Sequence, residues 1–322
     1  MARIGFHASH EQFPPSELLA LARRAEAAGF DAAMCSDHFH PWSAAQGQSG
    51  HSWSWLGAAM ATTGLPFAVV TAPVGRQHPA VVAQAVATLV EMHGDRFTLI
   101  AGSGEALNEA ITGERWPPKD LRNERLLEAV DIMRALWRGE EVTHRGAVTV
   151  EHAKLYTRPQ TPPPVFAAAL TPETAARAAT WADGLLTLSM PEAKLRDVIV
   201  AFRDSGGGDK PVHLQVKLSY AEDETVARHE AHAQWRTNAL EGEVSQELRT
   251  PRQFEDAARH LTVDDVCRAV RVSADLQRHV DWLAADLELG FARLYLHNVN
   301  RQQEAFVDAF GETVLPALRA GD

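Results

Sequence analysis

Two short segments hold most of the side chains that could take part in chemistry. Cys35–Trp42 contains an acid, two histidines and a tryptophan, and Gly102–Glu109 contains a Gly-Ser-Gly-Glu turn followed by further polar residues. Each follows an apolar run that is typical of a buried strand. Because the turns after parallel strands meet at one end of the sheet, where catalytic groups lie, the two segments predict an enzyme.

Proton transfer is the chemistry that these residue types favour. His38 can exchange protons near neutral pH, and we expect the preceding Asp37 to orient or charge its imidazole. Trp42 offers a flat apolar wall for an aromatic ligand. Glu105 can donate or accept a proton if burial raises its pKa. These four residues predict a site where a proton moves beside a flat ligand.

Backbone groups near two further strand ends are suited to holding a ligand. Gly102 and Gly104 let the backbone approach a ligand closely, with Ser103 between them. After the fifth expected strand, a helix is predicted to begin near Pro172, and the N-terminus of a helix attracts phosphate. The candidates for that phosphate site are Ala168, Ala169, Leu170 and Thr171.

A metal site is the alternative interpretation of the same loop. His38 and His40 form a His-x-His pattern, and two imidazoles near a strand end can share one ion. His7 and His297 are available as further ligands. The aspartate or lysine ligands that such a site would need at other strand ends are lacking, except for Lys217. This pattern keeps open the hypothesis of a metal-dependent barrel hydrolase.

Composition excludes several classes of protein. The chain has 322 residues, 45% of them hydrophobic, and a formal net charge of -11. That negative charge argues against a nucleic-acid binder, and no apolar run reaches the roughly 18 residues that a membrane span needs. The first residues lead directly into a strand, without a signal peptide, and Cys35 and Cys267 do not indicate a disulfide framework. We expect a cytoplasmic protein.

Short apolar runs alternate with helical patterns along the chain, which favours a (β/α)8 TIM barrel formed by a single domain over residues 1–322. Ser16 is the expected N-cap of the first helix, and Gly29 its end. Pro79 and Gly94 bound a later helix in the same way. The eight expected strands are Arg3–Ala8, Asp31–Ser36, Phe67–Ala72, Phe97–Ala101, Val165–Ala169, Gly184–Leu188, Val212–Ser219 and Ala292–His297.

Two segments exceed what a minimal barrel needs. Thr143–Arg158 has the pattern of a small hairpin before the fifth strand. Glu222–Val270 is long, charged and helical in pattern, and it lies between the seventh and eighth strands. Because long insertions in compact domains usually carry function, we expect this helical insertion to act as a lid or a subunit contact.

Five blocks together resemble the luciferase-like family of flavin- and deazaflavin-dependent oxidoreductases, near its branch of sugar-phosphate dehydrogenases that use coenzyme F420. The resemblance covers about the first 190 residues, and the blocks stand in the family's order and spacing. They are Ala8–Phe13, Ser36–Trp42, His78–Gln84, Gly104–Glu109 and Arg125–Ala129.

The resemblance implies roles for individual residues around an isoalloxazine-type ring. By position, His38 corresponds to the family's base, Trp42 to its ring-side aromatic residue, Glu105 to its proton donor and Glu11 to a further acid in the pocket. Asn108 belongs to the same cofactor-binding block. A non-proline cis peptide behind the ring, frequent in the family, aligns with Val69–Val70.

The chain departs from the sugar-phosphate branch where that branch holds the substrate phosphate. The branch has a threonine and a lysine there, and the corresponding residues are Leu188 and Pro191. Neither can pair with a phosphate dianion, so a phosphorylated sugar is not expected. The segment Gly113–Asp120 is similar to a subgroup thought to use FMN. FMN is therefore the expected cofactor, with F420 as the alternative.

The resulting hypothesis is a flavin-dependent oxidoreductase that transfers hydride between FMN, or F420, and a small organic substrate. A monooxygenase reaction and a flavin-binding protein without turnover remain open beside the metal-dependent hydrolase. The family's habit of pairing through helices implies a homodimer. Substrate identity is not fixed by the sequence, although Trp53, Trp55, Leu188 and Met190 indicate an apolar pocket.

Overall fold

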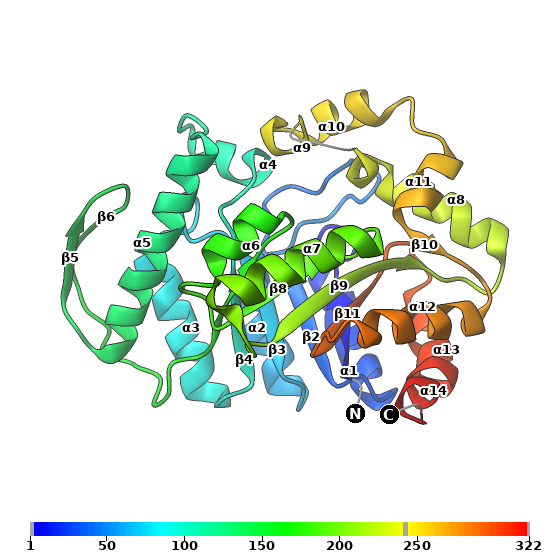
Figure 1. The fold of residues 1–322 in the computed structure, drawn as a ribbon, viewed down its shortest axis with the longest axis horizontal. Coiled ribbons are helices and arrows are strands. Elements are labelled where there is room, and N and C mark those ends of the chain that lie inside the picture. The colour runs from blue at the N-terminus through cyan, green and yellow to red at the C-terminus, as the bar shows by residue number, and fades with distance from the viewer. Residues whose placement is uncertain (1–2, 241–243, 321–322) are drawn as a thin grey trace.

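The apolar runs form a parallel barrel in the computed structural model, which describes residues 3–240 and 244–320. A nine-stranded sheet contains eight strands that close on themselves, in the order β9-β11-β1-β2-β3-β4-β7-β8 and back to β9. The predicted (β/α)8 barrel is thus confirmed (Figure 1). These eight strands are β1 (Ile4–Ala8), β2 (Ala32–Ser36), β3 (Phe67–Thr71), β4 (Phe97–Ala101), β7 (Val165–Ala168), β8 (Gly184–Leu188), β9 (Val212–Ser219) and β11 (Arg293–Asn298).

Both faces of the barrel strands are buried, which explains why their sequences are almost continuously apolar. Alternate side chains point inward and outward. On β9, Leu214, Val216 and Leu218 belong to the large core between strands and helices. A smaller cluster fills the barrel interior and includes Phe166 and Tyr295.

Proline and glycine set the ends of several barrel helices. Pro15, Pro79 and Pro172 each occupy the first turn of a helix, where the fixed φ of proline suits the helix and its missing N–H costs nothing. Pro14 is the residue before the first helix, so Ser16 lies inside the first turn and the predicted Ser16 N-cap is wrong. Gly94 ends its helix as predicted. The helices are α1 (Pro15–Ala27), α2 (Ser52–Thr62), α3 (Pro79–His93), α4 (Ala106–Glu109), α5 (Lys119–Arg138), α6 (Pro172–Ala178), α7 (Glu192–Phe202), α12 (Leu276–Glu288), α13 (Gln303–Ala309) and α14 (Leu315–Ala320).

Both predicted insertions are present as separate elements. The hairpin consists of β5 (Val142–Arg145) and β6 (Thr149–Ala153), which lie beside α5 at the left of Figure 1. The second insertion contributes four α-helices and the short 3-10 helix Arg236–Ala239 within the described residues, and the short strand β10 follows it; residues 241–243 lie outside the described residues. The α-helices and the strand are α8 (Glu224–Trp235), α9 (Val244–Glu247), α10 (Pro251–Ala258), α11 (Val263–Ala269) and β10 (Arg271–Val272).

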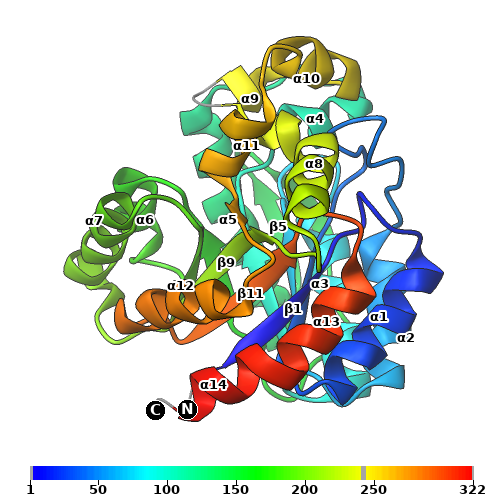
Figure 2. The same cartoon turned by 90° about the vertical axis from the view of Figure 1, so that its right-hand side faces the viewer.

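The helical insertion lies at the end of the barrel opposite the chain termini. In Figures 1 and 2, α8 to α11 are at the top, whereas the N- and C-termini are at the bottom. The top is the end where the parallel strands finish, so the insertion covers the turns that carry the candidate residues. Over residues 3–240 and 244–320, none of the helices has the length and apolar character to cross a membrane.

Candidate active site

A large cavity opens at the carboxyl ends of the strands. It encloses about 1390 Å³, including open solvent at its mouth, and each of the eight barrel strands or the turn after it lines the wall. The part of it that the centre of a water-sized sphere can occupy measures about 270 Å³, near the lower end of the roughly 300–1,000 Å³ of ligand pockets. The insertion adds Trp235, Asn238 and Gln246 to the wall.

All but one of the residues predicted to be catalytic or to bind the cofactor lie around this cavity, whereas of the four residues expected to make the pocket apolar only Leu188 lines it, and Trp53, Trp55 and Met190 do not. Val69 is the exception: its side chain is fully buried in the core outside the barrel, because adjacent residues of a strand point to opposite faces. The expected cis peptide at Val69–Val70 is also wrong, since the described residues contain no cis peptide bond. The predicted residues that do line the cavity are Glu11, Asp37, His38, Trp42, Val70, Gly102, Ser103, Gly104, Glu105, Asn108, Ala168, Ala169, Leu170 and Thr171.

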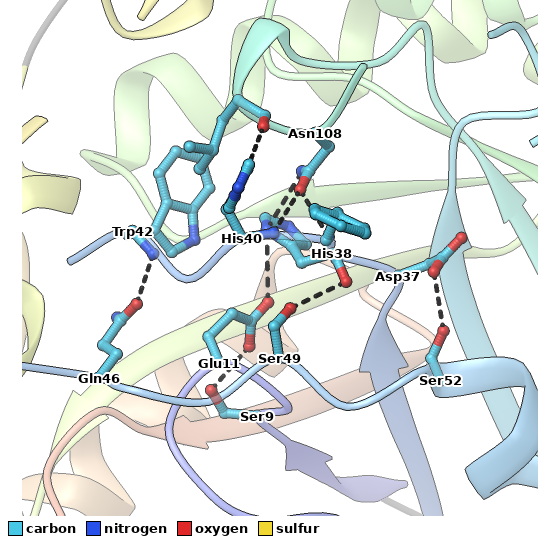
Figure 3. Close-up of polar contacts among 12 residues, drawn as sticks. Ser9, Glu11, Asp37, His38, His40, Trp42, Gln46, Ser49, Ser52 and Asn108 are labelled. Carbon is cyan, nitrogen blue, oxygen red and sulfur yellow. Dashed lines mark hydrogen bonds and ion pairs between the residues drawn. The ribbon is translucent and has the colours of Figure 1, made fainter. Parts of the chain in front are cut away.

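The His38 imidazole is held along its Nδ1 edge (Figure 3). Nδ1 lies 3.6 Å from Oε1 of Glu11 and 3.2 Å from Nδ2 of Asn108. Ser9 donates a hydrogen bond to the other carboxylate oxygen of Glu11 at 2.9 Å. The Asn108 amide donates to Nδ1, because its Oδ1 already accepts a hydrogen bond from the Phe39 backbone N–H at 2.9 Å. The Trp42 ring packs 5.3 Å from the imidazole, between centroids.

Glu11 is an acid kept ionised by histidines. Its side chain is only 4% exposed. Burial by itself would raise the pKa of Glu11, but the neighbouring His38 and His7 imidazoles outweigh burial and hold this pKa below its ordinary value. The carboxylate is therefore available to stabilise positive charge on His38.

Asp37 serves a different purpose from the one predicted. Figure 3 shows its carboxylate directed at Ser52 and away from the His38 ring. Its oxygens accept hydrogen bonds from Thr71 Oγ1 at 2.9 Å and Trp53 Nε1 at 3.2 Å, and Arg76 Nη2 lies 3.2 Å away. The predicted Asp37–His38 interaction is wrong, because successive side chains leaving a strand point in different directions. Glu11, not Asp37, is the acid beside His38.

These partners also fix the ionisation state of Asp37. Burial would raise its pKa, but Arg76 and the hydrogen bonds from Thr71, Trp53 and Ser52 together lower it. Arg76 also ties the strand end to Glu109, whose oxygen accepts a hydrogen bond from the Arg76 backbone N–H at 2.6 Å. Asp37 and Arg76 form a buried ion pair that stabilises the turn carrying His38.

The His-x-His pattern does not form a metal site. His40 Nδ1 lies 3.0 Å from the carbonyl oxygen of Leu107, and its ring packs against Phe39. Among the described residues, no group of three or more histidine, cysteine, aspartate or glutamate side chains could hold a metal ion. The hypothesis of a metal-dependent hydrolase has no support.

Glu105 has a buried carboxyl oxygen that a bound ligand could satisfy. Burial raises its pKa, and its Oε2 atom is buried without a hydrogen-bond partner. Gly104, just before it, has φ of +84°, a conformation that side chains other than glycine rarely adopt. A ring with a polar edge would satisfy Glu105, so the residues present fit a flavin-type cofactor.

The expected phosphate-binding segment lies beside the same cavity. Ala168, Ala169, Leu170 and Thr171 line the wall, and α6 begins just after them. Thr171 caps this helix, because its Oγ1 accepts a hydrogen bond from the Thr174 backbone N–H at 3.3 Å. The phosphate role of this segment stays a prediction.

Several cavity residues were not predicted, Gln215 and Trp235 among them, and Lys217 was considered only as a possible metal ligand. Gln215 and Lys217 point inward from β9, and polar residues at alternate positions of an otherwise apolar strand were a signal for them. Trp235 comes from the helical insertion, and its ring lies 4.6 Å from that of His297, between centroids. Nothing in its local pattern distinguishes it from a core residue.

The barrel and the residues that line its cavity agree with a cofactor-dependent oxidoreductase, and comparison with known proteins shows that class. A family model described as luciferase-like monooxygenase matches residues 1–293, and the chain belongs to that family. An F420-dependent glucose-6-phosphate dehydrogenase of Microbacterium testaceum is 36% identical over 98% of this chain and 97% of its own length. A second one, from Beutenbergia cavernae, is also 36% identical, over 99% and 98%.

Solved structures extend the comparison. An F420-dependent secondary alcohol dehydrogenase, determined with an F420–acetone adduct, is 31% identical, with a TM-score of 0.92 and 99% of each chain covered. The F420-dependent tetrahydromethanopterin reductase of Methanopyrus kandleri shares the fold at 18% identity, with a TM-score of 0.79 over 98% of this chain and 99% of its own. The relatives above 30% identity are F420-dependent, which agrees with the alternative cofactor and does not support FMN as the main one.

Proposed function

We propose that this protein is an F420-dependent dehydrogenase that oxidises a small secondary alcohol. The observation that carries the proposal is the His38–Glu11 pair in the same cavity as the unpartnered Glu105. The first can move a proton of the substrate, and the second can bind the polar edge of a ring. The likeness to the F420-dependent secondary alcohol dehydrogenase over 99% of the chain supports this assignment.

Each of the cavity residues discussed above has a defined part in the proposed reaction. When bound, the deazaflavin supplies an acceptor for the hydride that leaves the carbinol carbon. His38 takes the hydroxyl proton, and Glu11 stabilises the resulting imidazolium. Trp42 bounds the pocket beside His38, and Glu105 hydrogen-bonds the cofactor ring. Ala168–Thr171 lie where they can contact the cofactor's phosphate-bearing side chain.

Glucose 6-phosphate, the substrate named for several relatives, fits this cavity poorly. Leu188 lines the wall at the end of β8, where the sugar-phosphate branch has a hydroxyl. Pro191, at the position of that branch's lysine, is exposed and immediately precedes α7. A phosphate dianion would find neither donor there, so an unphosphorylated alcohol is the better substrate.

The test separates cofactor binding from turnover. Purified protein is titrated with F420 and with FMN by isothermal calorimetry, and F420 reduction is then followed with 2-propanol, 2-butanol or glucose 6-phosphate. We expect tight binding of F420 and reduction with an alcohol only. Binding without reduction by any donor would support a flavin-binding protein without turnover, and failure to bind F420 would overturn the proposal.

Two further expectations accompany this function. The family resemblance supports a homodimer, which light scattering after size-exclusion chromatography would test. A cytoplasmic location, as expected from the sequence, would be tested by cell fractionation with an antibody against this chain.

A further inference from the structure

The inward-facing side of β9 carries a cation into the cavity. His213, Gln215 and Lys217 alternate with the outward-packed Leu214 and Val216. His213 is the deepest, near Phe166 and Tyr295 in the barrel interior, and Lys217 is nearest the cavity mouth. Because β9 pairs with β8 and β11, Lys217 lies across the barrel from β3 and Gly102, beside Leu188 and His297.

The Lys217 ammonium lacks a protein partner of its own. Within residues 3–240 and 244–320 it makes no hydrogen bond and no ion pair, and Nζ lies over the Trp235 ring, 5.5 Å from its centroid. His7 and His297, which line the same wall, are held neutral because burial lowers the pKa of His7 to about 4 and that of His297 well below its ordinary value. Burial also lowers the pKa of Lys217, to about 8, so it is still mostly protonated at neutral pH.

The acids of the cavity are engaged elsewhere, with one exception. Glu11 lies beside His38, and Asp37 is paired with Arg76. Glu105 attracts Lys217 electrostatically, but the two groups are not in ion-pair contact. A carboxyl group and an ammonium thus face the cavity without touching. A buried cation without a partner is costly, and a ligand that placed a negative oxygen beside Nζ would recover that cost.

We propose that Lys217 binds a carboxylate of the substrate, so that the alcohol oxidised here is a small hydroxy acid. This inference rests on the proposed function and names its substrate class. A single ammonium matches the single charge of a carboxylate, whereas a phosphate dianion needs further donors that the apolar Leu188 and Trp235 do not offer. The hydroxyl proton goes to His38 and the hydride to F420, and the keto acid product keeps its carboxylate on Lys217.

The test uses two ligands that differ in charge but hardly in shape and that cannot react. Binding of isobutyrate and of isobutyramide is measured by calorimetry, with the F420-loaded protein and with the cofactor-free protein. The variants are K217M, K217R and the control K154M, which removes an exposed lysine after β6. Thermal melts of each variant establish that it is folded.

We expect the unchanged protein and K154M to prefer isobutyrate. K217M should weaken isobutyrate binding by roughly 10- to 100-fold and leave isobutyramide unchanged, because a hydrogen bond to a charged group is lost. K217R should retain most of the preference. With F420 loaded, 3-hydroxybutyrate should be oxidised with a lower KM than 2-butanol, and K217M should remove that difference.

Two results would overturn the inference. Equal binding of the two probes by the unchanged protein would show that no anion site exists. A K217M variant that loses F420 affinity while still preferring isobutyrate would make Lys217 a counter-ion of Glu105 instead. Failure to bind F420 would sink the proposed function alone, because the preference for isobutyrate is also measured without cofactor.

Discussion

The two sides of the cavity rim differ in how their polar groups are engaged. At the ends of β1 and β2, each acid has a protein partner: Glu11 lies beside His38, and Asp37 is paired with Arg76. Across the barrel, Lys217 faces the cavity without a hydrogen bond or ion pair to any residue in the described ranges. The difference indicates that the protein itself fixes the proton-transfer side, whereas a ligand completes the other side.

Acidification should have the largest effect, because it protonates buried histidines that are neutral in the folded protein and so destabilises the fold that holds both sides in place. Burial lowers the pKa of His7, His10 and His279 to about 4 and that of His213 to about 3. In the unfolded chain each histidine titrates near 6.5, so below that pH the unfolded state binds more protons than the folded state. The free energy of unfolding therefore decreases as the pH is lowered. Each histidine should cost about 1 kcal/mol by about pH 5.5, and several kcal/mol together. Urea unfolding at about pH 7 and pH 5.5 measures this; equal stability would contradict it.

The proton-transfer side has its largest single expected effect at His38. His38→Ala removes the proposed proton acceptor, so kcat should fall by roughly 10²- to 10⁴-fold while F420 affinity stays within a factor of about two. Stopped-flow reduction of F420 measures the rate, and calorimetry measures binding. Unchanged turnover would remove His38 from the mechanism.

Asp37 should affect the fold more than the reaction. Asp37→Asn removes the nearer of the two carboxylates beside Arg76, since Glu109 lies 4.0 Å away, and breaking a largely buried pair costs about 3 kcal/mol in the free energy of unfolding. Asp308→Asn, at the exposed pair with Arg24, serves as the matched control and should change stability much less. Urea denaturation compares the two variants. A loss of kcat by Asp37→Asn with stability intact would restore the role first expected for this acid.

Glu11, unlike Asp37, should affect turnover more than stability, and its effect should be the smallest of those predicted here. Glu11→Gln keeps the shape of the side chain but removes the charge that stabilises the His38 imidazolium, so kcat should fall about tenfold with KM little changed. Its thermal unfolding midpoint should stay near that of the unchanged protein. Equal kcat for Glu11→Gln and the unchanged enzyme would show that Asn108 alone orients His38.

Most of the fold could be predicted because parallel barrel strands are apolar, short and bounded by clear turn residues. The predicted limits of Phe97–Ala101, Gly184–Leu188 and Val212–Ser219 agree with β4, β8 and β9. The Ser16 cap was mispredicted because two prolines precede it and the second one takes the first helical position.

The site was predicted only in part, for a physical reason. Residues within one turn, such as His38 and Trp42, are near in sequence, so their closeness in space could be predicted. The pairing of His38 with Glu11 joins the turns after two different strands, so it depends on barrel geometry. Asp37 was assigned to His38 because the two are adjacent, yet adjacent side chains diverge at the end of a strand. Trp235 reaches the cavity through the insertion, whose path no local pattern reveals.

The helical insertion meets the turn after β2 through a small set of contacts. Gln46 donates a hydrogen bond to the Gln234 carbonyl oxygen at 3.0 Å, and Gln234 donates one to the Ala45 carbonyl oxygen at 3.1 Å. Phe254 packs edge-on against Trp42, with 5.1 Å between ring centroids. Part of the cavity wall thus comes from a segment that could be exchanged between relatives. A chimera that replaces residues 222–270 and keeps these contacts should change which alcohol is oxidised. The residues that transfer the proton would stay the same.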